Sequence, residues 1–327
     1  MTAHKGSKRT VYAALAGNLA IAATKLVAAA LTGSSAMLSE GVHSLVDTGN
    51  EVLLLYGLHR STLPPDDIHP LGHGRELYFW SFVVALLVFA LGAGVSIYEG
   101  ISHILRPEPM QRVVVNYAVL GLSALFEGIS WTVAVRQFRK AKGELGFIAA
   151  ARRSKDPTTF TVLFEDSAAL LGIAVAAIGI FAAERFGTPE LDGVASIGIG
   201  LVLALTAAFL ARESKGLLIG ERASRDLQRA IAAAAAEDPA VAAVEGVLTV
   251  HLAPDQVVVA LTADFEDDLP ASEIERCIAR LELRLEAEHA EIAALVIRPR
   301  PARRREALAS SRAGGTAAVR HDSTTSP

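Results

Sequence analysis

The stretch Ser39-Glu-Gly-Val-His-Ser-Leu-Val-Asp-Thr48 places a histidine and a carboxylate inside a long apolar segment. His43 and Asp47 are four residues apart, so on a helix they lie on one face, about one turn from each other. Ionisable groups at membrane depth are costly and predict a functional site. Imidazole and carboxylate together suit zinc, and also cobalt, nickel, iron or manganese. The alternative is a polar pair that only joins one helix to another.

Composition predicts a membrane protein. Hydrophobic residues make up 51% of the 327 residues, and the mean hydropathy is +0.37. The single cysteine, Cys277, excludes an intrachain disulfide and a cysteine-cluster metal site. A membrane-spanning helix needs about 20 apolar residues. The segments that reach this length are 10–31, 37–58, 77–104, 113–138, 158–183 and 191–210.

Basic residues flank these segments unequally, which predicts the orientation of the chain. One side has only Arg106, Arg112 and Arg185. The positive-inside rule therefore places both termini in the cytoplasm. The expected location is the cell (inner or plasma) membrane. The same rule explains the basic run 136–155, so no nucleic-acid partner is expected. The richer side collects Lys5, Lys8, Arg9, Arg60, Arg75, Arg136, Arg139, Lys140, Lys142, Arg152, Arg153, Lys155, Arg212 and Lys215.

The chain changes character after Gly220. An alanine-rich helix is expected at 222–237, followed by strands at 247–253 and 257–265, a helix at 270–289 and a strand at 292–297. The fold class is therefore a helical membrane protein with a small α+β domain of order αββαβ. The expected regions are a cytoplasmic N-terminus at 1–9, a six-helix transmembrane domain at 10–212, a cytoplasmic α+β domain at 213–300 and a disordered tail at 301–327.

The fifth apolar segment carries two adjacent acids, Glu165 and Asp166. Adjacent helix residues diverge by about 100°, so we expect one of them to join His43 and Asp47 and the other to face a cavity or a neighbouring helix. The alternative is a pair that reaches water near the end of the helix. Further polar residues inside the apolar segments can line a pathway or make helix–helix hydrogen bonds, and these are Asn50, Glu51 and Glu127.

The link between the second and third apolar segments carries Asp66, His69 and His73 within eight residues. Prolines shape this link, and a carboxylate with two imidazoles can hold a metal ion. The alternative is that these side chains are only solvated. The spacing alone favours neither interpretation.

These residues together resemble the cation diffusion facilitators, a family of metal–proton antiporters that includes the zinc transporters. The resemblance covers about 11–299 and is carried by the stretches 39–48, 69–76 and 166–172. The stretch 154–159, with Glu165 and Asp166, is similar to a branch related to a mitochondrial zinc transporter of animals. The resemblance implies a protein that is surrounded by membrane lipid and forms a homodimer.

The resemblance implies a tetrahedral transport site with two ligands from the second span and two from the fifth. His43 and Asp47 match the first pair, and Asp166 matches the later place of the second pair. The earlier place falls on Val162, which cannot bind a metal ion. A water molecule or Glu165 can replace it. Asp66, His69 and His73 match a second metal site of bacterial members, whereas the cytoplasmic domain lacks the family's metal ligands at Gly246, Thr262 and Ile297.

The expected function is efflux of a divalent cation, zinc first, in exchange for protons. His43 is the expected proton carrier, since an ordinary imidazole titrates near pH ~6.5. The alternatives are transport of manganese, iron or cobalt by the same mechanism, and a membrane metal sensor that transports nothing. No enzymatic activity is expected, because no His-Glu-x-x-His motif is present. No resident cofactor is expected, since the divalent cation is the cargo and protons are the counter-ion.

Overall fold

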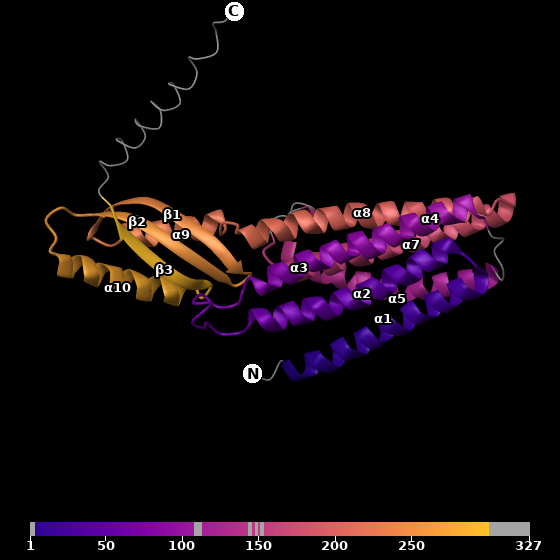
Figure 1. Cartoon of the computed structure of the whole chain (residues 1–327). Helices are drawn as coiled ribbons and strands as arrows, with labels where there is room; N and C mark the ends of the chain where they lie inside the picture. Colours follow the sequence, from indigo (N-terminus) through magenta and orange to yellow (C-terminus); the bar gives the residue numbers. More distant parts are fainter. Residues whose placement is uncertain (1–3, 108–112, 143–145, 148–149, 151–153, 301–327) are drawn as a thin grey trace, which may run out of the picture. The chain divides into compact units, whose positions relative to one another are not determined.

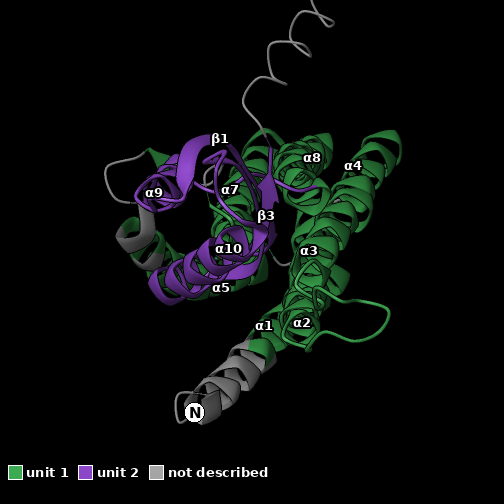
Figure 2. Cartoon of the chain, turned by 90° about the vertical axis from the view of Figure 1, so that its left-hand side faces the viewer, with its two compact units in different colours: residues 1–219 green, residues 220–327 purple. Residues whose placement is uncertain are grey.

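The chain forms two compact units, residues 1–219 and residues 220–327, in a computed structural model of its fold (Figures 1 and 2). The structure describes residues 4–107, 113–142, 146–147, 150 and 154–300. The tail at 301–327, which the sequence predicts to be disordered, lies outside these residues. The units divide after residue 219 rather than at the expected 212, because the last helix of the first unit continues to Ile219.

The first unit consists of long helices that run side by side (Figure 1). The third expected span is one continuous segment in which a π-helix separates two α-helices, and such π segments are often found at functional sites. The described helices are α1 (His4–Thr32), α2 (Ser35–Ser61), α3 (Glu76–Leu87), the π-helix η1 (Val88–Ala93), α4 (Gly94–Leu105), α5 (Val113–Lys142), α7 (Pro157–Phe186) and α8 (Glu190–Ile219).

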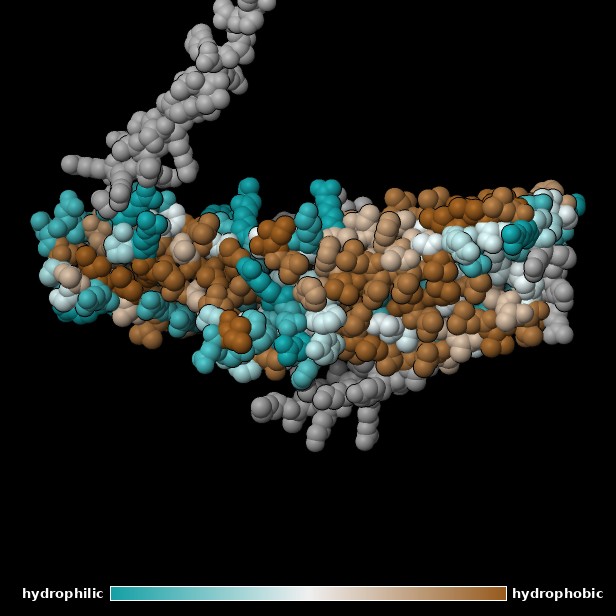
Figure 3. All heavy atoms as spheres, in the orientation of Figure 1, coloured by the Kyte–Doolittle hydropathy of each residue, from teal (hydrophilic) through white to brown (hydrophobic). Residues whose placement is uncertain are grey.

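Four segments of the described chain are long and apolar enough to cross a membrane, and a shorter apolar stretch covers Asn18–Thr32 in α1. Helix α2 is not among them, because acidic residues interrupt its apolar sequence. Side chains such as Leu205 (74% exposed) and Ile178 (67%) face outward, and hydrophobic residues cover much of this unit's surface in Figure 3. An apolar surface of this extent suits lipid rather than water. The four segments are Glu76–Leu105, Val113–Arg136, Phe160–Phe186 and Glu190–Ile219.

The start of α2 is held in place by a buried carboxylate of α8. Asp192 Oδ2 accepts hydrogen bonds from the backbone N–H groups of Ser35 (2.6 Å) and Ala36 (3.2 Å), and Oδ1 accepts one from the Ser34 hydroxyl (2.8 Å). Ser34 also caps the helix by accepting a hydrogen bond from the N–H of Met37. A carboxylate at a helix N-terminus is favoured by the unpaired N–H groups there. These bonds fix the position of the helix that carries His43.

Glycines allow α4 and α8 to approach closely. A Cβ atom added at Gly100 would lie 2.6 Å from the carbonyl oxygen of Gly193, and one added at Gly193 would lie 2.8 Å from the carbonyl oxygen of Gly100. Both obstacles are backbone atoms, which cannot rotate away as the end of a side chain can. Small residues at helix crossings are common in membrane proteins for this reason.

We expect Gly100→Ala to separate α4 from α8 and to lower stability by about 1 to 3 kcal/mol, the usual cost of overpacking. The control is Gly121→Ala in α5, because a Cβ atom there meets nothing within 4 Å. Alanine favours a helix over glycine, so the control should be neutral or slightly more stable. Thermal unfolding of the purified proteins in detergent measures both effects. Equal melting temperatures for Gly100→Ala and the wild type would contradict the close approach.

The second unit has the predicted αββαβ order. Its elements are α9 (Arg225–Ala236), β1 (Val241–Ala253), β2 (Gln256–Phe265), α10 (Ala271–Glu288) and β3 (Ile292–Pro299). The sheet order is β1-β2-β3, with β2 antiparallel to β1 and parallel to β3. Strand β1 begins earlier than the predicted 247, and its first half contains register shifts that blur the alternation of polar and apolar residues.

The core of this unit lies between the sheet and its two helices. Every second residue of β2 is buried, from Val257 to Phe265, as expected for a strand with one covered face. Ile231 of α9 and Leu281 and Leu285 of α10 pack in the same core. The apolar positions on each helix recur at intervals of three and four, so each helix buries one face.

Candidate metal transport site

One face of α2 carries a line of polar side chains at helical spacing. Glu40, Ser44, Asp47 and Glu51 are separated by four, three and four residues, so they form a single stripe along the helix. Helix α1 meets this stripe at two levels. Asn18 donates a hydrogen bond to Glu51 Oε1 (2.7 Å), and Lys25 lies further along α1, beside Glu40 and Ser44. Asp47 lies between these two levels.

A narrow cavity opens beside Asp47, among α1, α2, α5 and α7. Its volume is about 20 Å³, which is room for roughly one water molecule or one ion. Carboxylates from three helices therefore line a space of ionic size, which is unfavourable without a cation or bound protons, although no three of their ligand atoms lie within 4.8 Å of one another. The lining residues are Asn18, Ser44, Asp47, Glu51, Glu127, Val162, Glu165 and Asp166.

His43 is buried next to this cavity but is not among its lining residues. Its Nδ1 atom lies 3.3 Å from Asp47 Oδ1. Within the described chain, neither ring nitrogen of His43 has a hydrogen-bond partner, and Asp47 Oδ1 has none either. Buried polar atoms almost always make hydrogen bonds, so three neighbouring atoms that make none, apart from the 3.3 Å contact between Nδ1 and Oδ1, leave a place for a further group. A metal ion bound by the imidazole and the carboxylate fits this requirement.

Both acids of α7 line the cavity, although adjacent helix residues diverge. The divergence is visible in their partners, since Glu165 accepts a hydrogen bond from Asn50 of α2 (2.8 Å) and Asp166 accepts one from Ser130 of α5 (2.9 Å). Asn50 thus orients Glu165 and does not itself line the cavity. Glu51 and Glu127 line the cavity, as expected if they belong to a pathway. Glu51 also makes a helix–helix hydrogen bond with Asn18, which was the alternative role expected for these polar residues.

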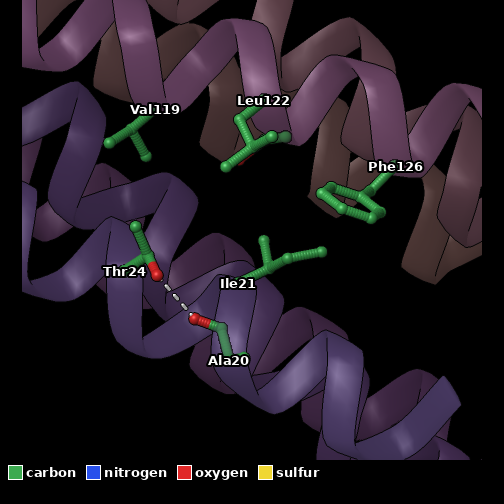
Figure 4. A pocket seen from close by; sticks show the side chains of 7 residues that line it. Ala20, Ile21, Thr24, Val119, Leu122 and Phe126 are labelled. Atoms are coloured by element: carbon green, nitrogen blue, oxygen red, sulfur yellow. Dashed lines mark hydrogen bonds between the residues drawn. The ribbon is translucent and has the colours of Figure 1, made fainter. Parts of the chain in front are cut away.

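A larger cavity between α1 and α5 does not suit an ion. Its volume is about 210 Å³, and its walls hold no titratable side chain (Figure 4). The hydroxyl of Thr24 points along its own helix and donates to the carbonyl oxygen of Ala20 (2.8 Å). The other lining residues are apolar except for one serine, and they are Ile21, Val119, Leu122, Ser123 and Phe126.

The loop between α2 and α3 brings its acid and two histidines together. Asp66 Oδ1 lies 3.2 Å from His69 Nδ1, and Asp66 Oδ2 lies 3.0 Å from His73 Nε2. In the described parts of the chain this is the only group of three or more His, Cys, Asp or Glu side chains whose ligand atoms lie within 4.8 Å of one another. Gly72, at a φ of 80°, allows the turn that brings His73 back to Asp66.

Hydrogen bonds keep Asp66 ionised. The backbone N–H of His69, followed by the His73 side chain and the backbone N–H of Ile68, lowers the pKa of this carboxyl to about 2. Asp66 is therefore a carboxylate throughout the physiological pH range and is ready to bind a cation.

We expect Asp66→Asn to weaken metal binding at the loop by about 10- to 100-fold, because a carboxylate ligand is replaced by a neutral amide. The loss should be the same at pH 6 and pH 8, since Asp66 is ionised at both. Equilibrium dialysis of the purified protein against zinc or cobalt measures the binding. Asp67→Asn is the matched control, because Asp67 is exposed and is not part of the cluster. Unchanged stoichiometry and affinity in Asp66→Asn would show that the loop binds no metal.

Three buried charged residues were missed by the sequence interpretation: Lys25, Glu40 and Asp192. All three side chains have no exposed surface. Lys25 lies in the middle of an apolar segment, and Glu40 lies one helical turn before Ser44. Ionisable residues at membrane depth are functional candidates, so this rule applied to both. Asp192 gave a weaker signal, because it lies near the start of a span.

Comparison with known proteins places the chain in a family. Residues 11–219 match the cation efflux transmembrane domain. The chain therefore belongs to the cation diffusion facilitators, and it is a multi-pass membrane protein.

Three relatives illustrate the family. The mitochondrial proton-coupled zinc antiporter SLC30A9 of Xenopus laevis is 35% identical over 210 residues, which cover 63% of this chain and 37% of the relative. Metal tolerance protein C4 of Arabidopsis thaliana is 34% identical over 162 residues, or 49% of this chain and 35% of the relative. The cation-efflux pump FieF of Klebsiella pneumoniae is 25% identical over 170 residues, or 52% of this chain and 51% of the relative. The matches thus span about half of these relatives or less.

Proposed function

We propose that this protein is a secondary active transporter that exports a divalent cation, zinc first, in exchange for protons. The observation that carries this proposal is the cavity of ionic size that Asp47, Glu165 and Asp166 line, next to His43, whose ring nitrogens make no hydrogen bond within the described chain. The proposed ligands are His43, Asp47 and Asp166, with Glu165 or a water molecule in the fourth place. The names of the zinc antiporter, the metal tolerance protein and the cation-efflux pump among the relatives support the same class of cargo.

Proton exchange follows from the chemistry of these ligands. Imidazole nitrogen and carboxylate oxygen bind a metal ion only when they are deprotonated, so binding of the cation releases protons. Release of the cation on the other side of the membrane lets protons return to the same atoms. Rocking of helices around a fixed site would supply the alternating access. The cation is cargo, and the proposal needs no resident cofactor and no catalytic group.

In the proposed topology the protein lies in the inner or plasma membrane of the cell, and both of its termini are in the cytoplasm. The basic residues near the α2–α3 loop and the end of α8 support it by the positive-inside rule. The Asp66, His69 and His73 cluster then lies on the cytoplasmic side, where it can receive the cation before transport.

The test is zinc uptake into inverted vesicles, or into proteoliposomes, under an imposed pH gradient. Uptake should require the gradient and stop when a protonophore collapses it. A panel of zinc, manganese, iron and cobalt then ranks the cargo. Zinc should lead, because His43 adds a nitrogen ligand that manganese favours less. Binding of metal without any flux would overturn transport and favour a membrane metal sensor.

We also propose that the second unit mediates a homodimer. The face of its sheet opposite the helices carries an apolar row across the three strands, where Leu248 pairs with Ala260 and Ala260 pairs with Val296. Leu248 is 69% exposed and Val296 is 58% exposed. An apolar row of this kind on an open sheet face supports an interaction surface.

We expect Leu248→Glu to shift the protein from dimer to monomer, because a buried charge at the centre of an apolar interface is unfavourable. Sedimentation of the full chain in detergent, corrected for bound detergent, measures the mass. The matched control is Leu283→Glu on α10, since Leu283 is also exposed (71%) but lies on a helix rather than on the sheet. If Leu248→Glu remains a dimer, this surface is not the dimer interface.

A further inference from the structure

Lys25 is a buried cation next to the cavity. Its ammonium group has no exposed surface and donates hydrogen bonds to Glu40 Oε2 (3.1 Å) and to the Ser44 hydroxyl (2.7 Å). Ser44 also lines the transport cavity. The ammonium is therefore one hydroxyl group away from the space proposed for the metal ion.

The carboxylate of Glu40 has a hydrogen-bond partner at only one of its two oxygens. Oε2 pairs with Lys25, but Oε1 is buried and has no hydrogen-bond partner among the described residues. Oε1 packs so closely against Gly172 of α7 that a Cβ atom added there would collide with it. The absence of a side chain at Gly172 is therefore what makes room for the second carboxylate oxygen, which is buried there without a hydrogen-bond partner among the described residues.

Asp192, another fully buried acid of the same unit, differs from Glu40 in its hydrogen bonds. Both oxygens of Asp192 accept hydrogen bonds, from Ser34, Ser35 and Ala36. That pattern is typical of a structural role, because a buried carboxylate is stable only when its acceptor positions are filled. Glu40 has the same burial and one open position, which a structural ion pair does not need.

The Lys25–Glu40 pair lies to one side of the cavity along the helices. Glu40 lies on the α2 stripe beyond Ser44, toward the turn at Gly33 and away from the loop that carries Asp66. With the proposed topology, this is the side on which the cation leaves. Lys25 and Glu40 therefore stand between the cavity and the release side of the membrane.

We propose that Glu40 is a second cation position on the release side of the transport cavity, and that the Lys25 ammonium occupies it when no metal ion is there. The inference rests on the proposed transport function. A divalent ion leaving Asp47 displaces the ammonium from Glu40, and the ammonium returns once the ion has left. Lys25 thus keeps the carboxylates of the cavity from binding the ion too tightly. Glu40 lowers the free-energy barrier for movement of the ion from the cavity to the release side.

The test uses Lys25→Met, Glu40→Gln and the double variant, reconstituted in proteoliposomes. Each single variant removes one charge of the pair and leaves the other buried without its partner. Folding of the single variants can suffer, because removing one partner of a buried ion pair is costly. The double variant removes both charges, so it should keep the melting temperature of the wild type to within a few degrees. Its zinc affinity at the cavity should also stay within about threefold, since the attraction of Glu40 and the repulsion of Lys25 are lost together.

Zinc flux is the measurement that decides. The double variant should transport at least about tenfold more slowly than the wild type, although it folds and binds zinc. The folded fraction of Lys25→Met should bind zinc more tightly and release it more slowly, because the tethered cation is gone. Wild-type flux in the double variant would reduce the pair to a structural role and overturn the inference. Absence of flux from the wild type itself would instead overturn the proposed function.

Discussion

Asp47→Asn combined with Asp166→Asn should lower zinc flux by at least about 100-fold, because it removes one carboxylate ligand from each of the two helices that meet at the cavity. Asparagine keeps the size of each side chain, and its amide can still accept the hydrogen bond that Ser130 donates to Asp166. The fold should therefore survive while the cation loses two negative partners. Reconstituted vesicles with an imposed pH gradient measure the flux.

The control for this experiment is Glu184→Gln, which removes an exposed carboxylate from the same helix, α7, far along the chain from the cavity. Its flux should equal that of the wild type. Zinc binding at the loop cluster should persist in the double variant, so the total stoichiometry should fall by one ion and not to zero. Undiminished flux in the double variant would exclude Asp47 and Asp166 as the essential ligands.

Periodicity and apolar length predicted most of the architecture. The αββαβ order and the buried face of β2 follow from residues that alternate with the period of a strand. The spacing of four between His43 and Asp47 placed both on one helical face. Each of the six apolar segments expected from the sequence lies in a helical segment of the structure, although within the described residues only four segments meet strict criteria of length and hydropathy, since α2 carries acids within its apolar sequence.

The partners of the polar residues could not be predicted, because they come from other helices. Asn50 as the donor to Glu165, and Ser130 as the donor to Asp166, depend on how α2 and α5 are rotated against α7. Lys25 illustrates the same limit. Its sequence position marks it as unusual, but only helix packing reveals that Glu40 and Ser44 receive its hydrogen bonds.

Val162 offers a prediction in the opposite direction, a gain of binding. It lines the cavity four residues before Asp166, at the place where a second ligand from α7 would lie. We expect Val162→Asp to tighten zinc binding by about 10- to 100-fold, because it supplies a fourth protein ligand in place of water or Glu165. Flux should fall at the same time, since an ion that is held more tightly leaves more slowly.

Thermal unfolding with and without zinc separates this gain from a simple change in stability. Another acid in a cavity already lined by Asp47, Glu165 and Asp166 should destabilise the metal-free protein, because like charges repel at short distance. Zinc should then stabilise Val162→Asp by more than it stabilises the wild type, as mass action requires of a ligand that binds the folded state more tightly. Val162→Asn is the matched control, since its neutral oxygen is a weaker ligand and adds no charge. An equal or smaller zinc-induced shift in Val162→Asp would mean that position 162 does not face the bound ion, and the fourth ligand would then have to come from Glu165 or from water.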